Sequence, residues 1–169
     1  MAPLVRRTWA PRGCTPLLLQ RTRSHKRVSA IAAIICEANG RCPRLLFRLH
    51  ADASINQFRV RSFLRQLRWQ LKCPLVIVWD RLGAHQGEPV RQYLKNHPLL
   101  HTYLFPPYAP ELNPVENLWC YLKMNPMAND AITDTPSLAH STRINSRRMQ
   151  YQPHLLRAFI RHTPLFSES

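Results

Sequence analysis

The amino-acid sequence predicts an α/β fold, in which helices pack on a sheet that mixes antiparallel and parallel strands. Two apolar runs separated by a turn sequence, within residues 28–50, predict a β-hairpin. After it, helical and strand patterns alternate up to residue 105, which is typical of helices layered on a sheet. The 169 residues suffice for one core of about 100 to 150 residues plus arms.

The predicted hairpin consists of two runs around a turn. Residues 28–37 are apolar and rich in β-branched side chains, and residues 44–50 form a second apolar run. Between them, Asn39 and Gly40 form an Asn-Gly pair, which favours chain reversal between strands.

A helix is predicted to start at Ser54, because Ser54 and Gln57 have the spacing of a capping box. Its apolar residues recur at helical spacing, at Val60, Phe63, Leu64, Leu67 and Leu71. Another face carries a basic stripe, composed of Arg61, Arg65, Arg68 and Lys72. Most such stripes are solvated faces, whereas the positive charge around this one favours contact with phosphates.

Two further strands are predicted around a second helix. Leu75–Trp79 is a near-continuous apolar run, as expected for a strand buried on both faces. Pro89 suits the first turn of the helix that follows. Residues 99–105 form the next apolar run and predict the last strand of the sheet.

Asp80 is the first of two candidate catalytic residues. It directly follows the predicted strand Leu75–Trp79, and ligand-binding groups in α/β sheets collect at the carboxyl ends of strands. Asp80 also fits a turn or N-cap aspartate, since Gly83 lies nearby. Its position alone leaves both interpretations open.

Glu116 is the second candidate, and it also has a purely structural interpretation. Asn113, Pro114 and Glu116 match the N-cap, N1 and N3 positions of a helix, where Glu116 would cap the helix end. Capping leaves unexplained the four prolines within residues 106–114, which predict a rigid loop that positions a functional group.

The predicted orientation of Glu116 favours a functional role. The core face of this helix is expected to comprise Val115, Leu118, Trp119 and Leu122. Glu116 lies about 100° from the centre of that face, so its side chain can overhang the end of a neighbouring strand. Lys123 lies on the same side two turns later and could hold a phosphate nearby.

The charge is large and uneven. The formal net charge is +15, and a protein this basic usually meets a polyanion. Residues 1–72 hold fifteen Lys or Arg against two acids, a net of +13, whereas residues 73–169 hold nine against seven, a net of +2. The first half therefore looks like the half that faces the polyanion.

Neither the cysteines nor the hydropathy indicate another class of protein. The five cysteines include no Cys-x-x-Cys pair, so neither a zinc site nor a disulfide framework is indicated. No apolar run approaches the roughly 18 residues of a membrane span. We therefore expect a reduced, cytoplasmic setting without a membrane partner.

Two motifs of this chain resemble the catalytic domain of DDE-type transposases of the mariner-like and insertion-sequence groups. Residues 106–119 read Pro-Pro-Tyr-Ala-Pro-Glu-Leu-Asn-Pro-Val-Glu-Asn-Leu-Trp and are similar to the sequence around the family's last catalytic Glu. Residues 78–85, Val-Trp-Asp-Arg-Leu-Gly-Ala-His, are similar to the sequence around its second Asp. Residues 7–16 resemble the segment after its first catalytic strand, and residues 155–159 its C-terminal helix.

The resemblance implies a ribonuclease H-like fold and metal-dependent cleavage and transfer of DNA strands. Asp80 and Glu116 would be catalytic and would bind Mg²⁺ or Mn²⁺. The residues expected to contact DNA are Arg61, Arg65, Arg68, Lys72, His85 and Lys123. His85 stands where the family commonly has a histidine, and it is otherwise interpreted as a contact to the carboxylates or a polar loop residue.

The family uses three carboxylates, and the first has no counterpart because no acid precedes Glu37. We therefore expect the first catalytic strand to be missing, its Asp to be encoded just upstream of Met1, and this chain to be inactive alone, with weak metal binding. The alternative is a non-catalytic basic nucleic-acid-binding protein derived from a transposase.

The resemblance also predicts how the chain is organised. Residues 1–27 would be a basic N-terminal arm, residues 28–124 a partial catalytic core, and residues 125–169 a linker and C-terminal helix. The expected partners are DNA, a helix-turn-helix region encoded upstream or separately, and a second copy of the chain. In a bacterium the protein would be associated with the nucleoid.

Overall fold

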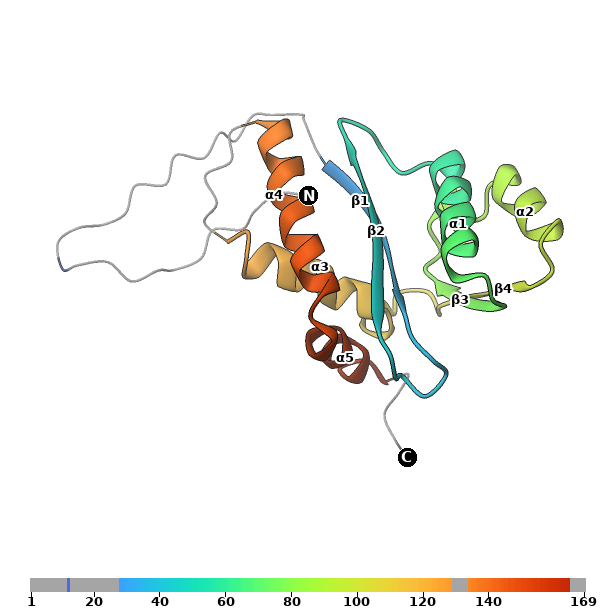
Figure 1. The fold of residues 1–169 in the computed structure, drawn as a ribbon. Coiled ribbons are helices and arrows are strands. Elements are labelled where there is room, and N and C mark those ends of the chain that lie inside the picture. Colours follow the sequence, from blue (N-terminus) through green and yellow to red (C-terminus); the bar gives the residue numbers. More distant parts are fainter. Residues whose placement is uncertain (1–11, 13–27, 129–133, 165–169) are drawn as a thin grey trace.

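The computed structural model describes residues 12, 28–128 and 134–164 and contains two small sheets with packed helices (Figure 1). Its elements are β1 (Val28–Ile35), β2 (Arg44–Ala51), α1 (Gln57–Leu71), β3 (Leu75–Trp79), η1 (Gly83–His85), α2 (Glu88–Lys95), β4 (Leu100–Leu104), η2 (Pro110–Leu112), α3 (Pro114–Met124), α4 (Thr135–Gln150) and α5 (Pro153–Arg161). Except for Arg12, the basic arm predicted for residues 1–27 lies outside the described residues.

The predicted hairpin is confirmed. β1 and β2 pair antiparallel, from Val28 opposite Ala51 to Ile35 opposite Arg44. In the connecting loop, Asn39 Oδ1 accepts a hydrogen bond from the Arg41 N–H at 2.9 Å, and Gly40 has a φ of 74°. That backbone conformation suits glycine, which lacks the Cβ that disfavours it.

The other two strands form a separate sheet. β3 and β4 are parallel, with Leu75 opposite Leu100 and Trp79 opposite Leu104, and α2 connects them. The predicted antiparallel and parallel pairs are thus both present, but each is a two-stranded sheet, because no described strand lies between β1 and β3 to join them.

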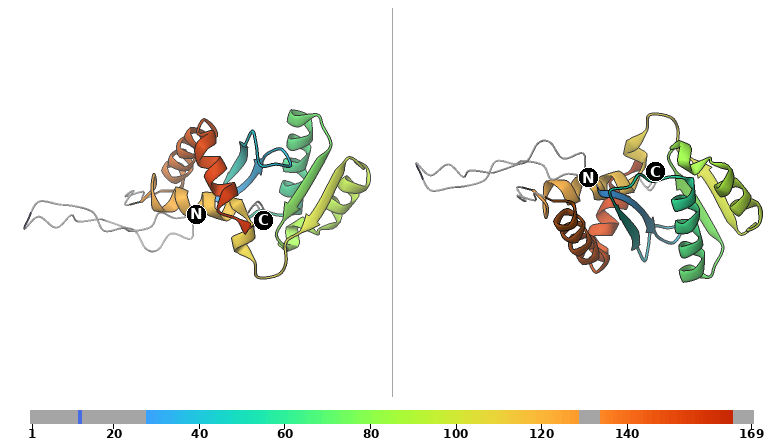
Figure 2. Two further views of the ribbon diagram at one scale, coloured as in Figure 1. Left: turned by 90° about the horizontal axis from the view of Figure 1, so that it is seen from below. Right: turned by 90° about the horizontal axis from the view of Figure 1, so that it is seen from above.

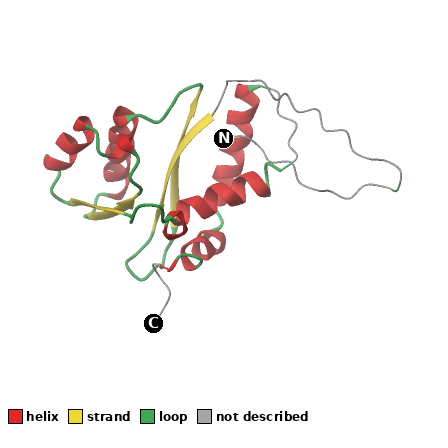
Figure 3. Cartoon of the chain, turned by 180° about the vertical axis from the view of Figure 1, so that it is seen from behind, coloured by secondary structure: helices red, strands yellow, loops and turns green. Residues whose placement is uncertain are grey.

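Two hydrophobic clusters hold the elements together on opposite faces of the hairpin. Figures 1 and 2 show the helices on these two sides, with α3, α4 and α5 on one side and α1 and α2 on the other. The first cluster contains Leu118 and Leu122 of α3 with residues of α4 and α5. The second contains Val60, Phe63, Leu64 and Leu67 of α1 and also includes residues of β1, β3 and α2. Figure 3 shows the same arrangement from behind.

The start of α1 differs from the prediction. Its N-cap is Asn56 rather than Ser54, since Asn56 has an extended backbone and its Oδ1 accepts a hydrogen bond from the Arg59 N–H at 3.1 Å. Gln57 is therefore the first helical residue and cannot complete a capping box from the third position.

The prediction that Leu75–Trp79 is buried on both faces is wrong for this structure. Leu75, Ile77 and Trp79 pack toward α1, but Val76 is 68% exposed and Val78 is 45% exposed. The reason is that the described helices near β3 cover one of its faces, whereas a doubly buried strand needs cover on both.

The C-terminal region contains more helix than predicted. α5 includes the predicted residues 155–159, but α4 lies within residues that the sequence suggests are a linker. The buried face of α4 includes Thr142, Asn145 and Ser146, so it lacks the apolar stripe by which amphipathic helices are recognised. No described helix is both long enough and apolar enough to cross a membrane.

The hairpin loop generates a prediction about thiol reactivity. A hydrogen bond and the negative charge of Glu37 raise the pKa of the exposed Cys42 thiol. The change Glu37→Gln removes that charge, so the pKa of Cys42 should fall and more thiolate should be present at pH 8. We expect iodoacetamide to modify Cys42 a few-fold faster in this variant, measured by mass spectrometry.

The exposed Cys73 serves as the internal control, and its rate should not change. An unchanged rate at Cys42 would contradict the described contact between Glu37 and the loop.

Candidate functional site

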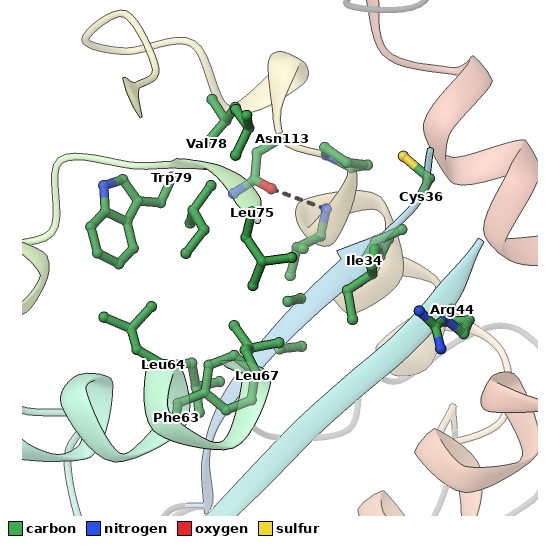
Figure 4. Close-up of a pocket in the computed structure, with 18 of the residues that line it drawn as sticks. Ile34, Cys36, Arg44, Phe63, Leu64, Leu67, Leu75, Val78, Trp79 and Asn113 are labelled. Carbon is green, nitrogen blue, oxygen red and sulfur yellow. Dashed lines mark hydrogen bonds between the residues drawn. The ribbon is translucent and has the colours of Figure 1, made fainter. Parts of the chain in front are cut away.

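A cavity of about 960 Å³ lies between the two sheets. Most residues that line this inter-sheet cavity come from β1, β3, α1 and the start of α3 (Figure 4). Its walls are mostly apolar, and Figure 4 shows Phe63, Leu64 and Leu67 on one side and Trp79 and Asn113 on another. Both candidate carboxylates, Asp80 and Glu116, line it.

Asp80 lies at the carboxyl end of β3, with its side chain 53% exposed. Its Oδ1 accepts a hydrogen bond from the Leu82 N–H at 3.0 Å, which is the turn geometry that aspartate often adopts. The turn interpretation is therefore correct for this oxygen. Among the described residues both recorded contacts of the carboxylate use Oδ1, so Oδ2 remains for a ligand.

The side chain of His85 contacts Asp80 and does not project freely from the loop. Its Nδ1 lies 2.9 Å from Asp80 Oδ1, and only 12% of its side chain is exposed. The imidazole stacks on Trp79, with ring centroids 4.6 Å apart and planes 4° from parallel. A histidine held in this way orients the carboxylate that it contacts. Of the predicted contacts of His85, the one with the Asp80 carboxylate is present in the structure.

Glu116 lies in the first turn of α3 and is exposed. Asn113 is the N-cap, as predicted, and its Oδ1 accepts a hydrogen bond from the Val115 N–H at 3.1 Å. A capping box would need the Glu116 side chain to accept from the Asn113 N–H, but this N–H donates to the Pro110 carbonyl at 3.0 Å. The capping interpretation of Glu116 is therefore wrong.

The proline-rich loop brings the start of α3, which carries Glu116, close to the end of β3, which Asp80 follows. The buried Phe105 begins it, and the Phe105 N–H donates to the Trp79 carbonyl at 2.8 Å. Arg81, next to Asp80, donates from Nε to the Phe105 carbonyl at 3.1 Å. The loop that leads to Glu116 is thus attached to the strand end that carries Asp80. Sequence reasoning missed Arg81, because an arginine after a strand has no distinctive pattern.

The predicted basic residues lie outside the cavity. Arg61, Arg65, Arg68 and Lys72 are all exposed, as a solvated face or a phosphate-binding face would be. They lie about 100° around α1 from the buried face that lines the cavity. Lys123 is half-buried in the last turn of α3 and does not line the cavity.

The cavity also contains an acid that the sequence did not single out. Glu37, just after β1, lines it together with Asp80 and Glu116. Even so, nowhere in the described part of the chain do three His, Cys, Asp or Glu residues cluster closely enough to hold a metal ion. The candidate site therefore consists of two carboxylates, and His85 contacts the first of them, Asp80.

Comparison with known proteins supports the fold and the family. The sequence profile described as DDE superfamily endonuclease matches residues 2–139. In the structure titled "Crystal structure of the Mos1 Strand Transfer Complex", a chain is similar over 94% of this chain and 50% of its own length, with a TM-score of 0.55 and 13% identity. No curated protein sequence matches this chain.

A second similar structure is the Mos1 transposase paired-end complex with left transposon end. Its TM-score is 0.55 at 12% identity, over 93% of this chain and 51% of that one. At such identities the likeness concerns the fold, and it confirms the predicted ribonuclease H-like α/β class. The present chain spans about half the length of both matched chains.

The geometry at the start of α3 predicts different costs for two substitutions. Asn113→Ala should lower the free energy of unfolding by about 1 kcal/mol, because the helix loses its N-cap. Glu116→Ala should cost about 0.5 kcal/mol or less, because only the favourable interaction with the helix dipole is lost. Urea denaturation measures both values, and an equal cost would mean that Glu116 is part of the cap.

Proposed function

This chain belongs to the DDE superfamily endonucleases, and on that premise we propose that it carries two carboxylates of a metal-dependent transposase site. In this proposal Asp80 and Glu116 are the catalytic metal ligands, and the reaction is the cleavage and transfer of DNA strands in transposition. The observation that carries the proposal is that these two acids, from separate elements, line one cavity.

The donor atoms fit the proposed metal. Mg²⁺ and Mn²⁺ favour carboxylate oxygens, and Asp80 and Glu116 supply them. The Oδ2 of Asp80 is left for a ligand by the described contacts, and no described contact engages the Glu116 carboxylate in capping. The fit is partial, since the described residues contain no third acid close enough to complete a metal cluster. We therefore propose weak binding.

In this proposal the protein itself orients the two carboxylates and holds them in position. His85 fixes Oδ1 of Asp80, while its stacking on Trp79 limits rotation of the imidazole. Glu116 lies in the first turn of α3, at the positive end of the helix dipole. When bound, the divalent ions would activate the attacking hydroxyl and stabilise the leaving oxygen of the phosphodiester.

DNA is the proposed partner. The exposed basic stripe on α1 would contact the backbone phosphates, and Lys123 and His85 would contact DNA near the site. The excess charge of the first half supports this, because phosphate contacts dominate DNA affinity. The similar Mos1 structures are described as a strand transfer complex and a complex with a transposon end, which supports the same class of partner.

We also propose that residues 1–169 alone do not cleave DNA. A site for two metal ions needs enough oxygen ligands to hold both ions about 3.5 to 4 Å apart, and two carboxylates are too few. The alternative is a basic nucleic-acid-binding protein without catalysis, which the exposed stripe on α1 favours. Nicking by the chain itself, abolished by Asp80→Ala and by Glu116→Ala, would contradict the proposed inactivity.

The proposed metal site predicts a specific loss of Mn²⁺ binding. The double change Asp80→Asn with Glu116→Gln should weaken binding at least about tenfold, since both ligands are removed. Electron paramagnetic resonance of free Mn²⁺ measures the affinity. The matched control is Glu88→Gln with Glu111→Gln, which removes two exposed acids that do not line the cavity. Equal losses in both variants would mean that Mn²⁺ binds non-specifically.

The basic stripe predicts a change in salt dependence. The double change Arg65→Gln with Arg68→Gln should weaken binding to duplex DNA and lower the slope of log K against log salt by up to about 2. Thermal stability should hardly change, because exposed charges contribute little to folding. Fluorescence anisotropy at several salt concentrations measures the slope.

The control for the stripe is Arg147→Gln with Arg148→Gln, an equal change in charge at exposed positions of α4. α4 lies on the other side of the hairpin from α1 (Figure 1). A flat salt response of the unmodified chain, or equal losses in both variants, would contradict phosphate contact by this stripe.

A further inference from the structure

Two large aromatic side chains lie on the same exposed face of α1 as the basic stripe. Trp69 is 72% exposed and Phe58 is 54% exposed. At about 100° per residue, these rings and the cations of the stripe fall within one arc of about 100° around the helix. The buried side chains of α1 lie outside this arc. One face of the helix therefore combines aromatic rings with positive charge.

Packing within the described part of the chain does not explain the exposure of Trp69. A tryptophan is usually buried over most of its side chain, because the indole carries a large apolar area. Among the described residues, no other ring stacks on Trp69 and no cation lies over it. Its indole is therefore available to a planar ligand.

Phe58 lies at the other end of this face, together with a cation. The guanidinium carbon of Arg61 lies 5.8 Å from the centroid of the Phe58 ring, which is within the range of a cation–π contact. About three helical turns, or roughly 16 Å, separate Phe58 from Trp69 along α1. The two rings can therefore contact different bases of one strand.

The cations on this face are placed beside the exposed indole. Arg65 lies about one turn before Trp69 and Lys72 lies about one turn after it, so each is a neighbour of Trp69 on the helix surface. α1 contains no acidic residue, and in the described part of the chain no acid forms an ion pair with the basic stripe. Phosphates on either side of a stacked base would each meet a cation.

The combination of rings and charge distinguishes between kinds of partner. An apolar protein surface would cover the rings but would leave the cations of the stripe desolvated without a counter-charge, which is costly. A polynucleotide supplies both the flat bases and the phosphates, and proteins that bind single strands use this pairing of aromatic rings with a basic surface. The face therefore fits a strand with unpaired bases.

We propose that this face of α1, composed of Phe58, Trp69 and the basic stripe, binds single-stranded DNA, with one base stacked on the indole of Trp69. The inference rests on the proposed function, in which DNA is the partner, and adds that unpaired bases are bound. Duplex DNA cannot use the rings in the same way, because its bases are stacked inside the double helix. Phe58 provides a second position for stacking.

The test measures binding of the full chain to three fluorescein-labelled ligands of equal length, about twelve nucleotides. They are oligothymidylate, an abasic strand that keeps the phosphates but has no bases, and a duplex. Fluorescence anisotropy should show that oligothymidylate binds at least about fivefold more tightly than the abasic strand, since the stacking of one base supplies that factor or more.

Substitutions of the exposed indole assign the difference to one ring. Trp69→Leu keeps an apolar side chain but removes the ring, so most of the preference for oligothymidylate over the abasic strand should be lost. Trp69→Phe keeps a ring and should retain part of the preference. The matched control is Tyr151→Leu, at an 86% exposed tyrosine that directly follows α4, and it should change nothing. Binding to the duplex should hardly change in any variant.

The outcomes separate this inference from the proposed function. Equal binding of oligothymidylate and the abasic strand, with a steep salt dependence, would overturn base stacking and leave the phosphate contacts in place. No binding to any of the three ligands would overturn both. An equal loss in Trp69→Leu and Tyr151→Leu would mean that bases stack on any exposed ring, which would overturn the assignment to α1.

Two further results would assign this face to another partner. Oligouridylate that binds several-fold more tightly than oligothymidylate would overturn the choice of DNA and make RNA the ligand. Concentration-dependent dimerisation that Trp69→Leu abolishes, without any preference for bases, would make the face an interface between copies of the chain. Circular dichroism checks that each variant is folded, and the comparison of oligothymidylate with the abasic strand tests the unmodified chain if a variant is not.

Discussion

The apolar face of α1 is the constraint on which the arrangement of both sheets depends. No hydrogen bonds join β1 to β3, so their relative position is set by what packs on both. Val60, Phe63, Leu64 and Leu67 of α1 form the buried centre of a cluster that includes side chains from both strands. Because burial of such side chains contributes about 1.5 to 3 kcal/mol each, this one helix can hold two separate sheets together.

The candidate site depends indirectly on the packing of α1 against the two sheets. Asp80 follows β3, which packs on α1, whereas Glu116 starts α3, which belongs to the other cluster. The two carboxylates are therefore carried by different cores. The loop that begins at Phe105 links them through backbone contacts with Trp79 and Arg81. Any change in the width of the inter-sheet cavity will alter the separation of the acids, which matters for ligands of a common ion.

Most elements could be predicted from local pattern, and the failures have physical causes. The hairpin, β3, β4 and the Asn113 cap follow from turn pairs, apolar runs and capping residues, which act over short stretches of chain. Ser54 and Asn56 are both good caps, and only the folded backbone decides between them. α4 was missed because polar residues such as Thr142 and Ser146 lie on its buried face.

The candidate site was predictable in its residue types but less so in its contacts. Asp80 and Glu116 could be chosen from their positions after a strand and at the start of a helix only together with the resemblance of their motifs to those of DDE transposases. The stacking of His85 on Trp79 and the exposure of Val76 could not, because they depend on which segments pack together in three dimensions. The capping interpretation of Glu116 could be rejected only once the Asn113 N–H was seen to donate to Pro110.

The position of β1 between the two clusters has a consequence for cooperativity. Ile31, Ala33 and Ile35 pack into one cluster, while Ala32 and Ile34 pack into the other. Proteins often open in partial units whose boundaries follow such clusters. Here each unit includes the same strand, so loss of order in β1 would release both at once. A weakened β1 should therefore loosen both clusters together.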